Sequence, residues 1–135
     1  MRTENGFTLI ELMVVLLLIA ILTGIALTVL TDERAKAMDV EAKQHVGNAY
    51  RQIEACKLES RDYRPCATAA ELTRMGLNLG TGAGDVELRN VTQDGFTAVG
   101  HSGTGAEFRI ERLPSGRTRS CDPPGEGGCH AGALW

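Results

Sequence analysis

What the sequence lacks excludes several classes of protein. It has no run of lysine and arginine, and a formal charge of −3 over 135 residues gives no electrostatic reason to expect nucleic acid as the main partner. Its four cysteines show no C-x-x-C spacing, which disfavours a zinc site. No serine or cysteine nucleophile is spaced with a base and an orienting acid. The sequence therefore predicts no enzyme, no metal site and no cofactor, and its length suits one modest domain.

The hydrophobic residues are concentrated in one segment near the N-terminus. Residues 7–30 form an apolar run that is interrupted only by Glu11, three threonines and Gly24. As a helix rising about 1.5 Å per residue, this run would be roughly 36 Å long, enough to cross a bilayer core. The rest of the chain is polar, glycine-rich and too small for a large core. All four cysteines follow the apolar run, which suggests an oxidising compartment for that part.

Residues 1–6 have the position of a leader peptide. A secretory signal would place a small-residue cleavage site after the apolar run, but residues 28–32 read TVLTD and contain no A-x-A pattern. The small residue beside the start of the run is Gly6. A cut after Gly6 on the cytoplasmic side would leave a mature protein that begins at Phe7 and keeps its membrane segment. Hydropathy by itself favours the alternative, an unprocessed signal anchor.

Glu11 argues against a plain anchor. A carboxylate inside a lipid-facing helix costs about 2.5–3.5 kcal/mol, so its presence indicates a function and a partner. The cut after Gly6 would create such a partner, the α-amine of Phe7. Glu11 could pair with that amine within one helix. Alternatively, it could pair with the Phe7 amine of a neighbouring subunit and set the axial register of a stack of parallel helices.

The residues from Gly6 to Val15, which read GFTLIELMVV, resemble the prepilin cleavage and methylation motif of type IV pilins and secretion-system pseudopilins. The motif is specific, because glycine, phenylalanine and glutamate stand at fixed offsets. The resemblance implies that a prepilin peptidase cuts between Gly6 and Phe7 and N-methylates Phe7, and that Glu11 sets the assembly register. Many members of the family carry a proline later in the apolar helix; here Gly24 is where any local melting would centre.

The resemblance also implies a function and partners. The protein would be a single-pass inner-membrane protein before assembly and then a structural subunit of an extracellular type IV pilus. Its partners would be the peptidase, membrane lipid, the inner-membrane assembly machinery and identical or homologous pilin subunits. A periplasmic type II secretion pseudopilin and a minor pilin with an adhesive or DNA-binding tip are the alternatives. Glu11 favours a repeating subunit. Calcium-binding pseudopilins have a carboxylate-rich loop, whereas only Asp122 and Glu126 lie near this C-terminus.

The helical pattern continues beyond the apolar run. Apolar residues recur at intervals of three and four and define one face of a helix: Ala35, Met38, Ala42, Val46, Ala49, Ile53 and Cys56. Polar residues occupy the other faces: Asp39, Lys43, Asn48, Arg51, Gln52 and Lys57. The pattern predicts one helix from Phe7 to about Leu58, roughly 78 Å long. Its first part, 7–30, would lie in the membrane or filament core, and its amphipathic part, 31–58, needs a covering layer.

The remaining residues predict that covering layer. Residues 59–85 form a connecting segment, with a turn at 60–66, a glycine-rich loop at 79–85 and a short helix between them. That helix would open with a capping box from Thr68 to Glu71 and end at Gly76. Strand-like runs follow at 86–92, 95–99, 107–113 and 118–121. The predicted fold is α+β and pilin-like, a long helix covered by a small antiparallel sheet.

Four cysteines allow three disulfide pairings, and the sequence alone does not choose among them. The local pairs Cys56–Cys66 and Cys121–Cys129 are favoured because each closes a short loop between elements. The first would tie the end of the long helix to the next loop. The second would close the C-terminal part of residues 86–135, and many pilins have a disulfide-bounded C-terminal region. Trp135 is expected to fold back onto the same domain as a core plug, and the alternative is an exposed adhesive contact.

Overall fold

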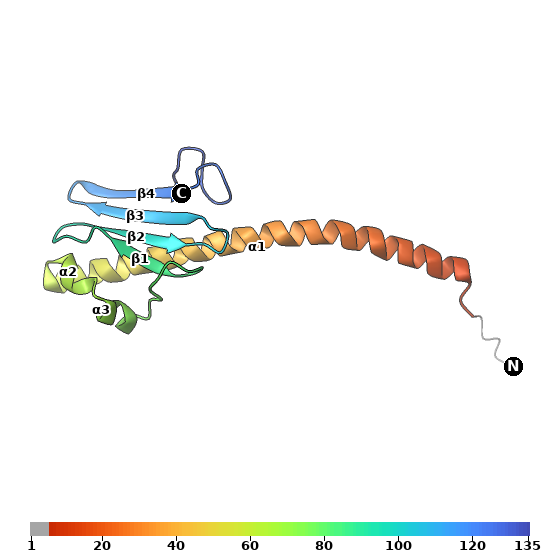
Figure 1. The fold of residues 1–135 in the computed structure, drawn as a ribbon, viewed down its shortest axis with the longest axis horizontal. Coiled ribbons are helices and arrows are strands. Elements are labelled where there is room, and N and C mark those ends of the chain that lie inside the picture. The colour runs from red at the N-terminus through yellow and green to blue at the C-terminus, as the bar shows by residue number, and fades with distance from the viewer. Residues whose placement is uncertain (1–5) are drawn as a thin grey trace. The chain divides into compact units, whose positions relative to one another are not determined.

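The structure, a computed structural model, describes residues 6–135, so residues 1–5 of the predicted leader lie outside the described part of the chain. The chain divides into two compact units, one ending at Arg34 and one running from Ala35 to Trp135. We call the second unit the head. The elements, labelled in Figure 1, are α1 (Leu9–Ser60), α2 (Tyr63–Cys66), α3 (Ala69–Arg74), β1 (Val86–Arg89), β2 (Phe96–His101), β3 (Glu107–Leu113) and β4 (Gly116–Asp122).

The predicted long helix is present as α1, which has 52 residues and continues through Gly24. Inside its apolar part, the hydroxyl of Thr23 donates a hydrogen bond to the carbonyl of Ile19 at 2.7 Å, which satisfies this polar group within the helix. The helix ends where Arg61 adopts a left-handed backbone with φ 59°. The Arg61 N–H donates to the Lys57 carbonyl at 2.7 Å, and this bond caps the last turn.

The four strands form one antiparallel sheet in the order β1-β2-β3-β4, which confirms the predicted α+β fold. Within the head, Figure 1 shows the sheet running along the second part of α1. Alternate residues of the strands point toward the helix, among them the buried Val86, Phe108 and Ile110. At Gly100 a Cβ atom would lie 2.5 Å from the Ala42 carbonyl oxygen, so glycine permits the close approach of β2 to α1.

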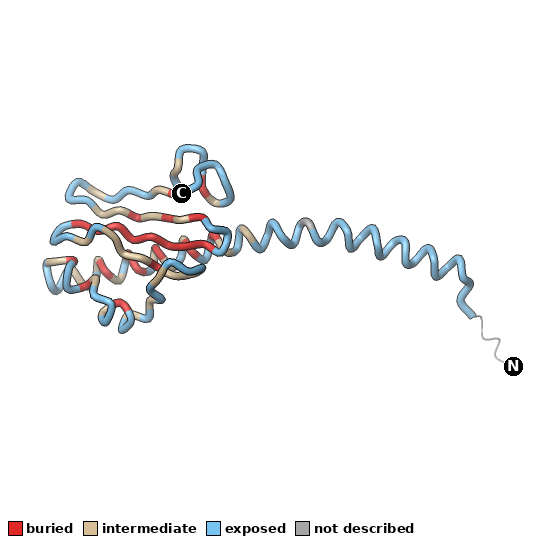
Figure 2. Tube along the Cα trace, viewed as in Figure 1, coloured by how far each residue is buried: buried red, intermediate tan, exposed pale blue. Residues whose placement is uncertain are grey.

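The hydrophobic core of the head lies between α1 and the sheet (Figure 2). Four residues of the predicted helix stripe are buried: Ala42, Val46, Ala49 and Ile53. The other three, at positions 35, 38 and 56, are half-buried. From the sheet side, Phe96 stacks on Tyr50 with ring centroids 5.6 Å apart. The predicted stripe is therefore confirmed as the surface that the sheet covers.

Some boundaries differ from the prediction. Residues 60–66, expected to be a turn, contain the single-turn helix α2, which begins because the Asp62 carboxylate accepts the Arg64 N–H at 2.9 Å. Strand β1 ends at Arg89, since Asn90 has a φ of 54° and leaves the extended conformation. Strand β4 is longer than predicted, because its pairing with β3 includes exposed polar positions that have no apolar alternation. The capping box at Thr68 is confirmed as the start of α3.

Asp39 corrects the prediction from helical spacing, which places this residue on a polar face of the helix. Its side chain is buried, with 2% of the residue exposed. It accepts hydrogen bonds from the hydroxyls of Ser102 and Thr104, both at 2.7 Å, and from the Gly128 N–H at 3.0 Å. Lys43 donates to the Gly128 carbonyl at 2.6 Å. We call these five residues the Asp39 clasp. Helical spacing does not reveal it, because all three donors come from distant loops.

The clasp controls the ionisation of its carboxylate. Burial by itself raises the pKa of Asp39, because the charged form is desolvated. The hydrogen bonds from Ser102, Thr104 and Gly128, together with the charge of Lys43, outweigh burial and hold the pKa below its ordinary value. The clasp therefore joins a charged carboxylate on α1 to the loop after β2 and to the C-terminal segment.

Candidate functional site

The surface of the apolar part of α1 is the most unusual feature of the molecule. Its large apolar residues are exposed, with exposed fractions from 44% at Val15 to 81% at Phe7. Figure 2 colours nearly all of this part of the trace as exposed. Within residues 6–135, one helix, α1, is long and apolar enough to cross a membrane. Soluble monomers rarely expose apolar surface on this scale. A cover from outside the chain, either lipid or other apolar helices, is therefore required.

The predicted processing residues lie immediately before this helix. Gly6 and Phe7 are exposed and non-helical. A Cβ atom at Gly6 would have no other atom within 4 Å, so the packing of the described chain does not require glycine at this position. A glycine that the fold itself does not need is consistent with a requirement imposed by another protein.

Thr8 starts α1 in a way that the sequence analysis missed. Its carbonyl accepts the Leu12 N–H at 3.2 Å, and its hydroxyl accepts the Glu11 N–H at 3.3 Å. Residues 8–11 read TLIE, which has the spacing of a capping box, a signal that the sequence analysis identified only at Thr68. Glu11 thus lies in the first turn, near the positive end of the helix dipole. Its position is compatible with two roles, support of the helix start and a pair with an amine.

The structure joins the cysteines in the two local pairs that the sequence favours. Cys56, near the end of α1, is bonded to Cys66 at the end of α2, and Cys121 on β4 is bonded to Cys129. Trp135 folds back onto the same region, as predicted, and its indole N–H donates to the Ser120 carbonyl at 2.8 Å. The C-terminal segment is therefore held by a disulfide, by the Asp39 clasp and by an aromatic anchor.

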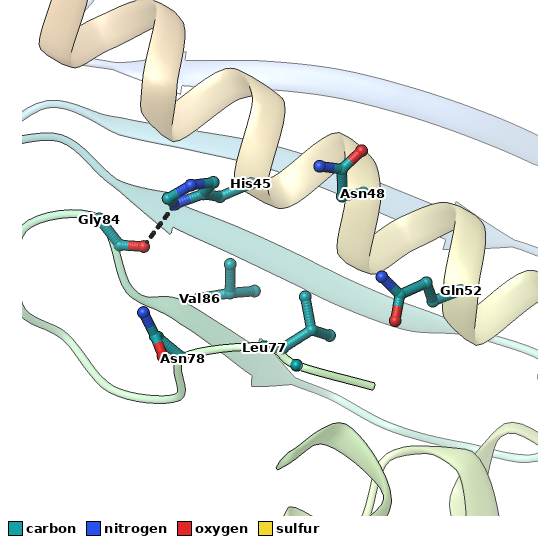
Figure 3. A pocket seen from close by; sticks show the side chains of 8 residues that line it. His45, Asn48, Gln52, Leu77, Asn78, Gly84 and Val86 are labelled. Carbon is teal, nitrogen blue, oxygen red and sulfur yellow. Dashed lines mark hydrogen bonds between the residues drawn. The ribbon is translucent and has the colours of Figure 1, made fainter. Parts of the chain in front are cut away.

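The head also contains a polar cavity of about 210 Å³ between α1 and the segment that precedes β1 (Figure 3). Its lining consists of His45, Asn48, Gln52, Gly76, Leu77, Asn78, Gly84 and Val86. The His45 Nδ1 lies 2.7 Å from the Gly84 carbonyl oxygen; because a carbonyl only accepts, Nδ1 carries the proton. The lining offers hydrogen bonds from an imidazole and three amides. It combines no nucleophile with that imidazole, and so provides no acyl-transfer or hydrolytic arrangement.

A capped, exposed apolar helix that leads into a sheet-covered, disulfide-closed head defines a pilin-like protein. The comparisons agree. The family described as "Prokaryotic N-terminal methylation motif" matches residues 1–27. The Type IV wide pilus major component PilA4 of Thermus thermophilus is 28% identical over 104 residues, which cover 76% of this chain and 78% of the relative. No solved structure matches the chain.

These findings confirm the resemblance to type IV pilins and pseudopilins that the first residues indicate. The methylation motif covers the positions assigned to cleavage and register, and the similarity to PilA4 extends over most of the chain. Together they support a structural subunit of the pilin or pseudopilin type. The motif and the apolar helix fit insertion into a membrane followed by assembly.

Proposed function

We propose that the chain is a prepilin whose apolar helix anchors it in the inner membrane and then packs with copies of itself in the core of a type IV pilus. The observation that carries this proposal is the exposed apolar surface from Phe7 to Leu30, which overlaps the match to the methylation motif over residues 1–27. Such a surface needs lipid as its first cover and an equally apolar cover once the subunit leaves the membrane. Parallel copies of the same helix supply the second cover.

Processing is the first step of the proposed function. A prepilin peptidase cuts between Gly6 and Phe7 and methylates the new amine of Phe7. Mass spectrometry of the protein from membranes and from sheared filaments should find the loss of residues 1–6 and the addition of one methyl group. Gly6→Ala should impair cutting only mildly, whereas Gly6→Leu should hardly be cut at all, because a bulky side chain would fill the peptidase subsite. A mature protein that retains Met1, or that starts beyond Leu30, would refute the assignment.

A pilus rather than a pseudopilus is the preferred assembly. The relative PilA4 is named as the major component of a wide pilus, and the similarity spans more than three quarters of both chains. In our proposal the inner-membrane assembly machinery adds the processed subunit to a filament that extends outside the cell. Abundance provides the test: this chain should dominate the protein in sheared surface filaments. If it is a trace component there, a minor pilin or a pseudopilin becomes the better assignment.

A further inference from the structure

A second cavity in the head, of about 340 Å³, lies at the end of α1. Its lining consists of Glu54, Lys57, Leu58, Arg61, Tyr63 and Arg112. Three of these side chains are cations and one is a carboxylate, so the lining carries two net positive charges. The cations come from three places in the chain, namely α1, the residue that follows α1, and β3. The lining of this cavity is therefore net positive, although the whole chain is net negative.

Several hydrogen-bond donors of these cations are unused. The Nε of Arg112 lies 3.3 Å from the Tyr63 hydroxyl and 3.4 Å from a Glu54 carboxylate oxygen. Its two terminal amino groups have no acceptor within residues 6–135, and neither has the Arg61 side chain. Lys57, in contrast, is already engaged: it donates to the Asp94 carboxylate at 3.0 Å and to the Gln93 carbonyl at 3.1 Å. The Asp94 side chain is 62% exposed, and such surface pairs are weak. A guanidinium has five N–H donors in a planar fork, so most of the donor capacity of Arg61 and Arg112 is free.

The backbone conformation of Arg61 is also unusual for an arginine. Arg61 has φ 59°, a conformation that glycine most often supplies at the end of a helix. Its backbone N–H makes the capping bond to Lys57, and a glycine would make the same bond without steric cost. Lys57 already supplies the cation that the last turn of a helix favours. The arginine side chain is therefore not explained by the turn that it occupies.

We propose that this cavity is a binding site for a tetrahedral oxyanion, a phosphate or sulfate group, held by the guanidinium groups of Arg61 and Arg112. Their planar forks match two oxygens of such a group, and Lys57 adds a point charge beside them. The proposal concerns the head alone and does not depend on cleavage or assembly. The free ion and the same group carried by a larger molecule share this chemistry.

The test uses the full chain, isotopically labelled and held in a non-ionic detergent. Inorganic phosphate and glycerol 3-phosphate are titrated in separate arms against sodium chloride of equal ionic strength, and the Arg61, Arg112 and Tyr63 resonances are followed. We expect saturable shifts that chloride does not produce. Saturation in both arms supports a site that accepts the group on a larger molecule; saturation with inorganic phosphate alone supports a site for the free ion.

Two variants probe the binding groups, and a third serves as a control. Arg61→Gly should raise the apparent Kd roughly tenfold, the loss of about one charge-assisted hydrogen bond, while raising the Tm because the left-handed backbone is relieved. Arg112→Lys should weaken binding similarly by removing the fork and keeping the charge. Arg74→Ala, an exposed arginine that does not line the cavity, should leave the Kd unchanged.

Three results would overturn the proposal. The first is the absence of any saturable shift beyond that of chloride in both arms. The second is wild-type affinity in Arg61→Gly together with Arg112→Lys. The third is an equal loss of affinity in Arg74→Ala and Arg61→Gly, which would mean diffuse attraction to a positive surface rather than a site.

Discussion

The two parts of α1 carry apolar surfaces that are covered in opposite ways. From Ala35 onward one face of the helix is covered by the chain's own sheet, and the stripe residues such as Val46 and Ile53 are fully buried. Before Arg34 every described large apolar side chain is exposed. The difference shows that one helix can belong both to a domain that covers its own core and to a surface that needs another molecule. The head obtains its cover within the chain, and the apolar segment must obtain it from lipid or neighbours.

Two carboxylates on α1 repeat this contrast. Asp39 is buried and receives three hydrogen bonds from loops of the same chain. The Glu11 carboxylate is exposed and accepts no hydrogen bond within residues 6–135. If the apolar segment becomes buried in a filament, Glu11 will need a partner there, because an unpaired buried charge is costly. Substitution of either carboxylate tests this difference between the two parts of α1.

The largest effect is expected at Glu11. Glu11→Ala should leave a buried Phe7 amine without a partner, at a cost of several kcal/mol per contact, and filaments should be lost or sparse. Insertion in the membrane should improve, because the only charge in the span is removed. The measurement is the ratio of protein in membranes to protein in sheared filaments. An unchanged filament yield would contradict the hypothesis that Glu11 sets the register of the subunits.

Two further variants separate the register role of Glu11 from its role at the helix start. Glu11→Gln keeps a side chain that suits a capping box but has no charge, whereas Thr8→Ala removes the cap and keeps the charge. If the charge pair matters, Glu11→Gln should assemble as poorly as Glu11→Ala, and Thr8→Ala should assemble well. Good assembly of Glu11→Gln together with poor assembly of Thr8→Ala would indicate that Glu11 acts in capping the helix.

In the head, loss of either disulfide should lower the free energy of unfolding. Each bond closes a loop of roughly ten residues, for which about 2–3 kcal/mol is expected. The double variants Cys56→Ser/Cys66→Ser and Cys121→Ser/Cys129→Ser should both melt at lower temperature. The two pairs should also appear as separate linkages in non-reducing peptide maps. A Cys56–Cys121 linkage, or four free thiols, would contradict the layout of the head.

The contact between β2 and α1 should be sensitive to a single methyl group. Gly100→Ala would place a Cβ 2.5 Å from the Ala42 carbonyl oxygen, and the resulting shift of backbone should cost about 1–3 kcal/mol in chemical unfolding. Gly47→Ala and Gly24→Ala are matched controls, because a Cβ meets nothing within 4 Å at either helical position. Both should be neutral or slightly stabilising in the isolated chain. Equal changes in the free energy of unfolding at all three glycines would show that the close contact between β2 and α1 is not the cause of the effect at Gly100.

The smallest effect concerns pH and the Asp39 clasp. The folded-state pKa of Asp39 lies below its ordinary value, so its contribution is fully present above the unfolded pKa and is lost as pH falls through the folded one. Because an ordinary aspartate titrates near pH 3.9, the loss should occur below about pH 4. The Tm of the wild type should therefore fall more steeply on acidification than that of Asp39→Asn. Asp122→Asn, at an exposed carboxylate, is the control and should follow the wild type. Parallel curves for all three proteins would show that the clasp does not depend on charge.

Much of this architecture could be predicted because it depends on local pattern. The apolar run, the fixed offsets of Gly6, Phe7 and Glu11, the stripe of α1 and the capping box at Thr68 are all expressed within a few turns of chain. The cap at Thr8 was equally visible in residues 8–11. Strand positions followed from alternation wherever one face is buried, as in β3.

The remaining features depend on residues that are distant in sequence. Ser102, Thr104 and Gly128 reach Asp39 only after the sheet and the C-terminal segment have folded onto α1, so helical periodicity assigned a buried charge to the surface. Likewise, Lys57, Arg61 and Arg112 form one cavity only because β3 packs beside the end of the helix. Hydrophobic period and cap spacing are properties of neighbours along the chain and were decided by the sequence itself. The partner of a polar group is decided by tertiary structure, because that structure alone determines which distant donors lie within hydrogen-bonding distance.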